Sequence, residues 1–413
     1  MFPTPYYHID EAALDGDVTM LREALRGAWG ENVICSYSVK TNALPWLLTH
    51  LKKHGFFAEV VSETEYDLAH RLGFADERMI YNGPIKDRAV FERLLLAGGL
   101  VNMDSSQEPV WLAALAAAHP QRTFAVGVRV NVDLAALVPD EVLADEEGSR
   151  FGYCYENGEL AKVIGRVTEI PNAYLAGLHL HSSTKSRSVR VFAALARAAV
   201  RIAREYGLSL SYVDMGGGYF GGRAGMPDYR DYMPAIAAEL RRGFDPAKTA
   251  LVVEPGVSLI SRATSFVTAV RDVKRVREHV YVVTDGGRVH LNPQVTRRSY
   301  PHHLVYHGTP AAERERLPAQ MVCGYTCMEY DRLFEEKDAP ALREGDLVVY
   351  ETAGGYTMCL NPLFIRYLPA VWIEKKDGSF FQAREAWTND EFLRKNHWEA
   401  TEGGSVQLAG NFP

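Results

Sequence analysis

Eight short apolar runs, spaced along residues 30–256, constrain the fold of this chain most strongly. Each run has the length of a buried strand, and a segment with apolar residues at helical spacing follows it. Eight strands that each precede a helix are typical of a (β/α)8 barrel of parallel strands. A doubly wound open sheet is the alternative with the same alternation. The predicted strands are 33–39, 56–61, 78–82, 100–104, 124–130, 174–181, 209–214 and 250–254.

Helix signals lie between these runs. Ser62-Glu63-Thr64-Glu65 is a capping box, which predicts a helix from Glu63 to Leu72. Alanine-rich segments at 110–118 and 191–204 have the spacing of further amphipathic helices. The helices therefore alternate with the strands, as a barrel requires.

The pattern changes after residue 262, where β-rich segments without helical partners follow. A second, mostly antiparallel domain is expected there, since 413 residues exceed what one core usually supports. The strand-like opening Thr4 to Ile9 is expected to join its sheet. We therefore expect residues 11–262 to form the barrel, and residues 1–10 with 263–413 to form the second domain. The β-rich segments are 264–270, 280–284, 347–351 and 363–371.

Bulk properties exclude several function classes. A net charge of -7 and a pI near 6.0 argue against nucleic-acid binding, because there is no excess of basic residues. No apolar run reaches the ~18 residues of a membrane span, and Met1 to Pro5 lacks the features of a signal peptide. Five cysteines are odd in number and sparse, which favours the cytoplasm. Cys323 and Cys327 have no second pair at zinc spacing, so no metal is expected.

Lys40 follows the first predicted strand, where a side chain points toward the mouth of a barrel. A partly desolvated amine with a lowered pKa could form a Schiff base with an aldehyde cofactor. A solvated surface lysine is the alternative explanation.

Three further strand ends carry candidate groups. Gly216, Gly217 and Gly218 follow the seventh strand and let backbone N–H groups approach a phosphate, although a flexible turn has the same composition. Glu254 ends the eighth strand and could hold a pyridine nitrogen protonated, or it is an ordinary residue before a turn. His179 and His181 share one face of the sixth strand, where one could stack on a flat ring, or both could be core histidines.

With these residues in order, the chain resembles the fold-type III pyridoxal-phosphate amino acid decarboxylases, the family of diaminopimelate and ornithine decarboxylases. The resemblance covers nearly the whole chain to about residue 370. The matching segments are 4–7, 37–42, 62–65, 129–131, 150–152, 177–181, 214–219, 254–256, 323–331 and 354–357.

The resemblance implies pyridoxal 5'-phosphate as cofactor and assigns roles to individual residues. Lys40 would form the aldimine, Glu254 would pair with the pyridinium, and His181 would stack on the ring. Cys327, supplied across a homodimer interface, would return a proton after decarboxylation. The phosphate would be held by Gly216, Gly217, Gly218, Gly256, Tyr356 and Thr184.

The chain departs from the family pattern where the substrate is expected to bind. Val257 replaces the arginine that usually follows Glu-Pro-Gly, and Met328 replaces an acidic residue after Cys327, with Glu329 one step later. Asp285 matches an aspartate that faces the substrate. Candidate substitutes for missing contacts are Arg297, Arg298 and Tyr300, although a solvated basic turn is the alternative.

The resemblance therefore predicts decarboxylation of a polar amino acid, or of a conjugate of one, in a specialised pathway. An amino acid racemase on the same barrel is the rival enzyme, but such racemases resemble a pattern with arginine where Glu254 stands. A non-catalytic regulator and a barrel without cofactor are the two remaining hypotheses. Retention of Lys40 and Cys327 argues against the regulator.

Overall fold

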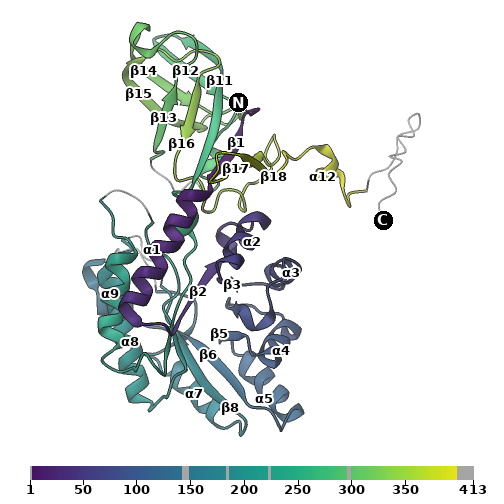
Figure 1. The fold of residues 1–413 in the computed structure, drawn as a ribbon, viewed down its shortest axis with the longest axis vertical. Coiled ribbons are helices and arrows are strands. Elements are labelled where there is room, and N and C mark those ends of the chain that lie inside the picture. The colour runs from purple at the N-terminus through teal and green to yellow at the C-terminus, as the bar shows by residue number, and fades with distance from the viewer. Residues whose placement is uncertain (1, 142–147, 183–185, 222–224, 295–298, 398–413) are drawn as a thin grey trace.

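The computed structural model describes residues 2–141, 148–182, 186–221, 225–294 and 299–397. Two sheets organise the chain (Figure 1), one surrounded by helices and the other without large helices of its own. Helix α1 (Glu11–Trp29) runs from the second sheet along the first.

The first sheet is a closed barrel of eight parallel strands. The pairing of β5 with β6 closes it, and this excludes the open doubly wound sheet. The short β7 (Tyr153–Cys154), which the sequence did not predict, pairs at the edge of β6. The barrel strands are β2 (Val33–Ser38), β3 (Phe57–Val60), β4 (Met79–Tyr81), β5 (Leu100–Met103), β6 (Phe124–Asn131), β8 (Ala173–His179), β9 (Tyr212–Asp214) and β10 (Ala250–Val253).

Helices alternate with these strands. The predicted capping box opens α3 (Glu63–Arg71), where the Ser62 hydroxyl accepts a hydrogen bond from the Glu65 N–H at 3.2 Å. The other helices around the barrel are α2 (Pro45–Lys53), α4 (Arg88–Ala97), α5 (Glu108–Ala118), α6 (Leu134–Leu137), α7 (Glu159–Thr168), α8 (Val189–Glu205), α9 (Tyr229–Leu240) and α10 (Val257–Ile260), with 3-10 turns at Val39–Thr41, Asp76–Arg78 and Pro139–Glu141.

The barrel interior is filled by side chains. The buried Tyr212 side chain occupies the space above Gly127 and Gly177: an added Cβ would lie less than 3.0 Å from its hydroxyl at Gly127 and from its ring at Gly177. Its hydroxyl donates to Asn102 Oδ1 at 2.8 Å. The glycines thus make room for an aromatic ring that helps to close the barrel beneath its mouth.

The second sheet is mostly antiparallel, with parallel pairs β1–β17 and β12–β14. Strand β1 lies between β11 and β17, so the opening of the chain pairs with a strand near its other end. The strands are β1 (Tyr6–Asp10), β11 (Thr264–Val276), β12 (His279–Thr284), β13 (His302–Val305), β14 (Arg316–Cys323), β15 (Arg332–Pro340), β16 (Leu347–Tyr350), β17 (Ala370–Glu374) and β18 (Phe380–Arg384).

Several details of this sheet differ from the sequence prediction. Strands β13, β14, β15 and β18 were not predicted, and the strand expected at 363–371 begins only at Ala370. Short helical segments also occur, at Arg288–Leu291 (α11), Ala311–Glu313 and Asn389–Leu393 (α12). Among the described residues, the structure has no helix with the length and apolarity needed to cross a bilayer.

Candidate active site

A cavity of about 360 Å³ opens at the carboxyl ends of the barrel strands. The strand-end rule therefore places the predicted groups together although they are far apart in sequence. The predicted residues that line the cavity are Lys40, His181, Gly217, Gly218, Glu254, Gly256 and Tyr356.

Lys40 lies in the 3-10 turn that follows β2. Its Nζ is 2.6 Å from Oε2 of Glu59, a buried residue of β3, and its side chain is 38% exposed. Burial disfavours the ammonium, but the carboxylates of Glu59 and Glu254 outweigh this and raise the pKa of Lys40. The lowered pKa expected from the sequence is therefore wrong for this structure, because a carboxylate lies against the amine.

Glu254 is buried directly after β10, within 3.5 Å of His179 Nε2. Burial opposes its charge, but His179, Lys40 and a hydrogen bond from Asp214 lower the pKa of Glu254 to about 2. Burial and the Glu254 charge raise the pKa of Asp214 well above its usual range. Asp214 is thus the protonated partner, and Glu254 is an ionised carboxylate facing the cavity.

His181 is a neutral imidazole. Burial and the nearby charges of Arg129, His179 and Lys40 lower its pKa to about 3. Its Nδ1 accepts the Gly217 N–H at 3.2 Å, which leaves the proton on Nε2. The His179 and His181 rings lie side by side with centroids 6.2 Å apart, as the shared strand face predicted.

The glycine loop after β9 has an irregular backbone, with φ of +63° at Gly216 and +95° at Gly218. The Gly216 N–H donates to Asp214 Oδ1 at 2.9 Å, and the Gly217 N–H donates to His181. The sequence predicts three backbone N–H groups for a phosphate, and two of them, those of Gly216 and Gly217, already donate to protein groups. Tyr356, also at positive φ, is held beside the loop's cavity by its N–H, which donates to Thr41 O at 3.0 Å.

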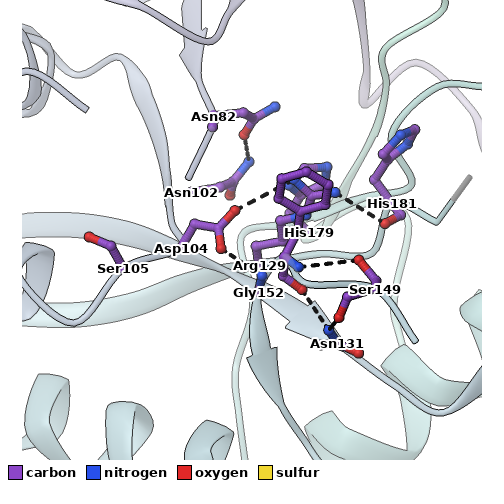
Figure 2. A network of polar contacts seen from close by, with 12 residues as sticks. Asn82, Asn102, Asp104, Ser105, Arg129, Asn131, Ser149, Gly152, His179 and His181 are labelled. Atoms are coloured by element: carbon purple, nitrogen blue, oxygen red, sulfur yellow. Dashed lines mark hydrogen bonds and ion pairs between the residues drawn. The ribbon is translucent and has the colours of Figure 1, made fainter. Parts of the chain in front are cut away.

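Asparagines connect the carboxylates beneath the cavity. Asn82 Nδ2 donates to Glu254 Oε1 at 2.7 Å and to Glu59 Oε1 at 3.2 Å. Asn102 donates to Asn82 Oδ1 at 2.9 Å (Figure 2). The side-chain amide of Asn82 thus links Glu59, which contacts Lys40, to Glu254.

A second set of contacts fixes the wall formed by β6 (Figure 2). Arg129 Nη1 lies 3.5 Å from Asp104 Oδ2, and Nη2 donates to His181 O at 3.4 Å. The Arg129 guanidinium lies over the Phe151 ring, 4.7 Å from its centroid. Sequence reasoning missed Glu59, Asn82 and Asp104. Asn82 and Asp104 end predicted strands, so the same rule could have found them, whereas Glu59 lies inside the predicted strand 56–61.

Other predicted residues lie away from the cavity in this chain. Cys327 and Glu329 are exposed in the connection between β14 and β15, and Glu329 pairs with Arg332 at 3.1 Å. Asp285 is buried and accepts from Thr4 and Arg271, and Tyr300 is buried against Asn292. Their roles stay predictions. Thr184, Arg297 and Arg298 lie outside the described residues.

Comparison with known proteins identifies the family. Residues 17–261 match the family model for the pyridoxal-binding domain of pyridoxal-dependent decarboxylases. The chain is 29% identical over 406 residues to a probable chloroplastic diaminopimelate decarboxylase of Oryza sativa subsp. japonica, covering 95% of this chain and 79% of that protein. It is 24% identical to the L-glutamyl-[BtrI acyl-carrier protein] decarboxylase of Niallia circulans, covering 95% and 93%.

The fold also matches solved structures. Diaminopimelate decarboxylase from M. jannaschii in complex with L-lysine superposes with a TM-score of 0.82 at 22% identity, covering 96% of this chain and 93% of that one. That structure shares the barrel and the second, mostly antiparallel sheet.

The residues of the cavity fit pyridoxal phosphate. Lys40 offers an amine for an aldehyde, Glu254 an ionised carboxylate for a pyridine nitrogen, and His181 a neutral flat ring. An added Cβ on Gly218 would meet only open space and His181 at 3.8 Å, so the backbone there is free to approach a ligand closely. The donor set and the family match lead to one conclusion: the chain belongs to the pyridoxal-dependent decarboxylases and is a pyridoxal-phosphate-dependent amino acid carboxy-lyase.

Proposed function

We propose that this enzyme decarboxylates a polar amino acid, or a conjugate of one, at the cavity of the barrel mouth. The observation that carries the proposal is that Lys40, His181 and Glu254 line one cavity beside the Gly217–Gly218 backbone. Residues 11–262 would form the cofactor-binding domain, and residues 1–10 with 263–413 the second domain. The five free cysteines favour a reducing compartment, the cytoplasm.

Each group in the cavity has a role that suits its charge. The Lys40 amine would bind the cofactor aldehyde, and His181 would stack on its ring. Ionised Glu254 would keep the pyridine nitrogen protonated, which suits its pKa of about 2. Bound pyridoxal phosphate supplies an electron-withdrawing ring that accepts the electron pair left when carbon dioxide departs.

Glu59 would accept a proton from the Lys40 ammonium. The amine must be neutral to act as a nucleophile, yet the nearby carboxylates raise its pKa. Glu59 Oε2, 2.6 Å from Nζ, is placed to accept that proton. Asn82, which hydrogen-bonds both Glu59 and Glu254, would keep the acceptor in position.

The glycine loop, with Gly256, Tyr356 and Thr184, would bind the cofactor phosphate. Gly217, Gly218, Gly256 and Tyr356 line one cavity, which supports their sharing of one ligand. The positive φ values at Gly216 and Gly218 support a loop shaped for close approach by an anion.

Cys327 would donate a proton to the substrate carbon after carbon dioxide is lost. Its thiol is exposed and does not line the cavity of its own chain, which favours delivery to the cavity of a second subunit. A homodimer would then be the working unit. Glu329, two residues further along and also exposed, would reach the same cavity and contact the distal part of the substrate.

The substrate would carry a polar group at its far end, in addition to the amine and carboxylate at the carbon that loses carbon dioxide. The similar proteins are named for diaminopimelate and for glutamate on an acyl-carrier protein, and both molecules have such a group. Asp285, Arg298 and Tyr300 are the remaining candidates for substrate contacts. Val257 and Met328 argue for a substrate different from diaminopimelate.

The test is release of carbon dioxide by the holoenzyme from a panel of L- and D-amino acids, with diaminopimelate and carrier-linked glutamate included. We expect release from polar members of the panel and none from a Lys40→Ala variant. Absence of release from every member, with cofactor demonstrably bound, would refute the proposal.

A further inference from the structure

Arg187 lines the cavity, and its guanidinium lies over the ring of Phe220, two residues beyond Gly218. It follows β8 and precedes α8, and it lines the same cavity as Gly217, Gly218 and Val257. Val257 contributes an isopropyl group there, so this end of the cavity has no cation from position 257. Arg187 therefore adds a guanidinium to a lining in which Gly217, Gly218 and Val257 present only backbone and apolar atoms.

The glycine loop by itself is a weak site for a phosphate. The N–H groups of Gly216 and Gly217 are donated to Asp214 and His181. A phosphate monoester carries about 1.5–2 negative charges near neutral pH, so neutral donors alone compensate it poorly. A charged, planar donor beside the loop would supply both charge and paired hydrogen bonds.

Three further basic residues line the cavity, and each is positioned by groups outside the glycine loop. Lys40 lies 2.6 Å from Glu59, and Arg129 lies 3.5 Å from Asp104. Arg150 lies over the Phe151 ring, 4.2 Å from its centroid, the same ring that Arg129 covers. Arg129 and Arg150 are thus grouped around Phe151, whereas Arg187 is fixed to the glycine loop.

Contacts with Tyr232 and Phe220 hold Arg187 in place. Its carbonyl accepts the Tyr232 hydroxyl at 2.6 Å, and that hydroxyl in turn accepts the Phe220 N–H at 3.3 Å. The Arg187 guanidinium lies over the Phe220 ring, 5.4 Å from its centroid. Phe220 is two residues beyond Gly218, so Tyr232, which is fully buried, ties the arginine to the glycine loop.

The backbone of Arg187 is also strained. Its φ of +47° lies in the left-handed region, which costs free energy for a residue with a Cβ. Such conformations persist where surrounding contacts impose them, and they concentrate at ligand sites. Here the imposed conformation puts a cation at the cavity.

We propose that the Arg187 guanidinium binds the phosphate group of pyridoxal phosphate and replaces the cation absent at Val257. This inference rests on the proposed placement of the phosphate at the Gly216–Gly218 loop. Arg187 is then a cofactor-binding residue that discriminates the phosphorylated cofactor from pyridoxal, which lacks the phosphate.

The test compares the affinity of the apoenzyme for pyridoxal phosphate and for pyridoxal. We expect Arg187→Ala to weaken binding of pyridoxal phosphate by about 10- to 100-fold, the usual loss for a charge-assisted hydrogen bond, and to leave pyridoxal within about twofold. Arg187→Lys, which keeps the charge without the fork, should be intermediate. Thermal unfolding of each apoenzyme verifies that the variants fold.

Arg190→Ala is the matched control, because Arg190 lies three residues along, on the exposed side of α8, and pairs with Glu141 at 3.4 Å. It should bind both ligands as the wild type does. An equal loss for both ligands in Arg187→Ala, or no loss for either, would overturn the role of Arg187. A wild type that does not distinguish the two ligands would instead refute the phosphate placement itself.

Discussion

At the scale of single residues, the charge of Lys40 is set by groups that lie far from it in sequence. Glu59 in β3 hydrogen-bonds the amine, and the charge of Glu254, directly after β10, acts on it as well. Asn82 donates hydrogen bonds to both carboxylates and adds no charge of its own. The Lys40 side chain is therefore held as an ammonium next to Glu59, the carboxylate proposed to accept its proton.

Replacing Glu59 by glutamine should change the pH at which Lys40 reacts. In the wild type the Glu59 and Glu254 carboxylates raise the pKa of Lys40, so the neutral amine appears only at higher pH. Glu59→Gln removes one of these charges and lowers that pKa. The rate of pyridoxal phosphate binding by the apoenzyme, followed as a function of pH, should therefore have its midpoint at lower pH.

Glu63→Gln is the control for this experiment, since Glu63 is an exposed residue in the first turn of α3. Its profile should coincide with that of the wild type. A Glu59→Gln profile with an unchanged midpoint would mean that Glu254 alone sets the charge of Lys40.

The sequence could predict which residues meet at the cavity but not how they are charged. Lys40 follows a predicted strand and His181 and Glu254 end predicted strands, and strand ends converge in a barrel whatever the details of packing. The direction of the Lys40 pKa was predicted wrongly, because Glu59 sits inside an apolar run and its approach depends on the register of β2 with β3. Such cross-strand distances have no local sequence signal.

At the scale of elements, the barrel was predictable because its strands are buried on both faces. Continuous apolar runs such as 250–253 stand out from the helices between them. Strand β15 was missed because more than half of its side chains are charged, and β14 because a proline interrupts it. The N-terminal part of the predicted segment 363–371 forms no strand.

Gly177→Ala tests how tightly the barrel is packed. The new methyl group would lie less than 3.0 Å from the Tyr212 ring, while the backbone at Gly177 is not in the left-handed region, so the effect is steric. We expect a loss of about 1–3 kcal/mol in the free energy of unfolding, measured with urea, because overpacked cores shift rather than compress.

Gly27→Ala provides the comparison for that loss. Gly27 lies in α1, and an added Cβ there meets no atom within 4 Å. Alanine should stabilise the helix by about 0.5–1 kcal/mol. If Gly177→Ala is as stable as Gly27→Ala, the Tyr212 ring can move aside, and the barrel interior around it is less tightly packed than the distances indicate.

At the scale of the whole molecule, the groups proposed for one reaction are divided between two domains. Lys40 and Glu254 belong to the barrel mouth, and Cys327 lies exposed in the connection between β14 and β15 of the second domain, outside the cavity of its own chain. Strand β1 pairs within that second sheet and continues directly into α1, which packs along the barrel. This junction restrains the second domain, so a partner subunit is the simpler source of a thiol than a large movement within one chain.

Subunit complementation tests this division. Lys40→Ala and Cys327→Ala should each form almost no decarboxylated amine alone, because the first lacks the amine for the cofactor aldehyde and the second lacks the thiol that returns the proton. If each cavity takes its thiol from the partner, a mixed dimer contains one site with both mutations and one site with neither. Equal mixing after subunit exchange should then restore about a quarter of the wild-type rate of amine formation, because about half of the dimers are mixed and each has one intact site.

The same mixture distinguishes the competing arrangement. If Cys327 served the cavity of its own chain, every site in a mixed dimer would lack either Lys40 or Cys327, and mixing would restore nothing. Tagging one variant and isolating the mixed dimers ensures that exchange has occurred before the rate is measured. Restored activity thus requires the thiol to cross between subunits, since no single chain in the mixture carries both side chains.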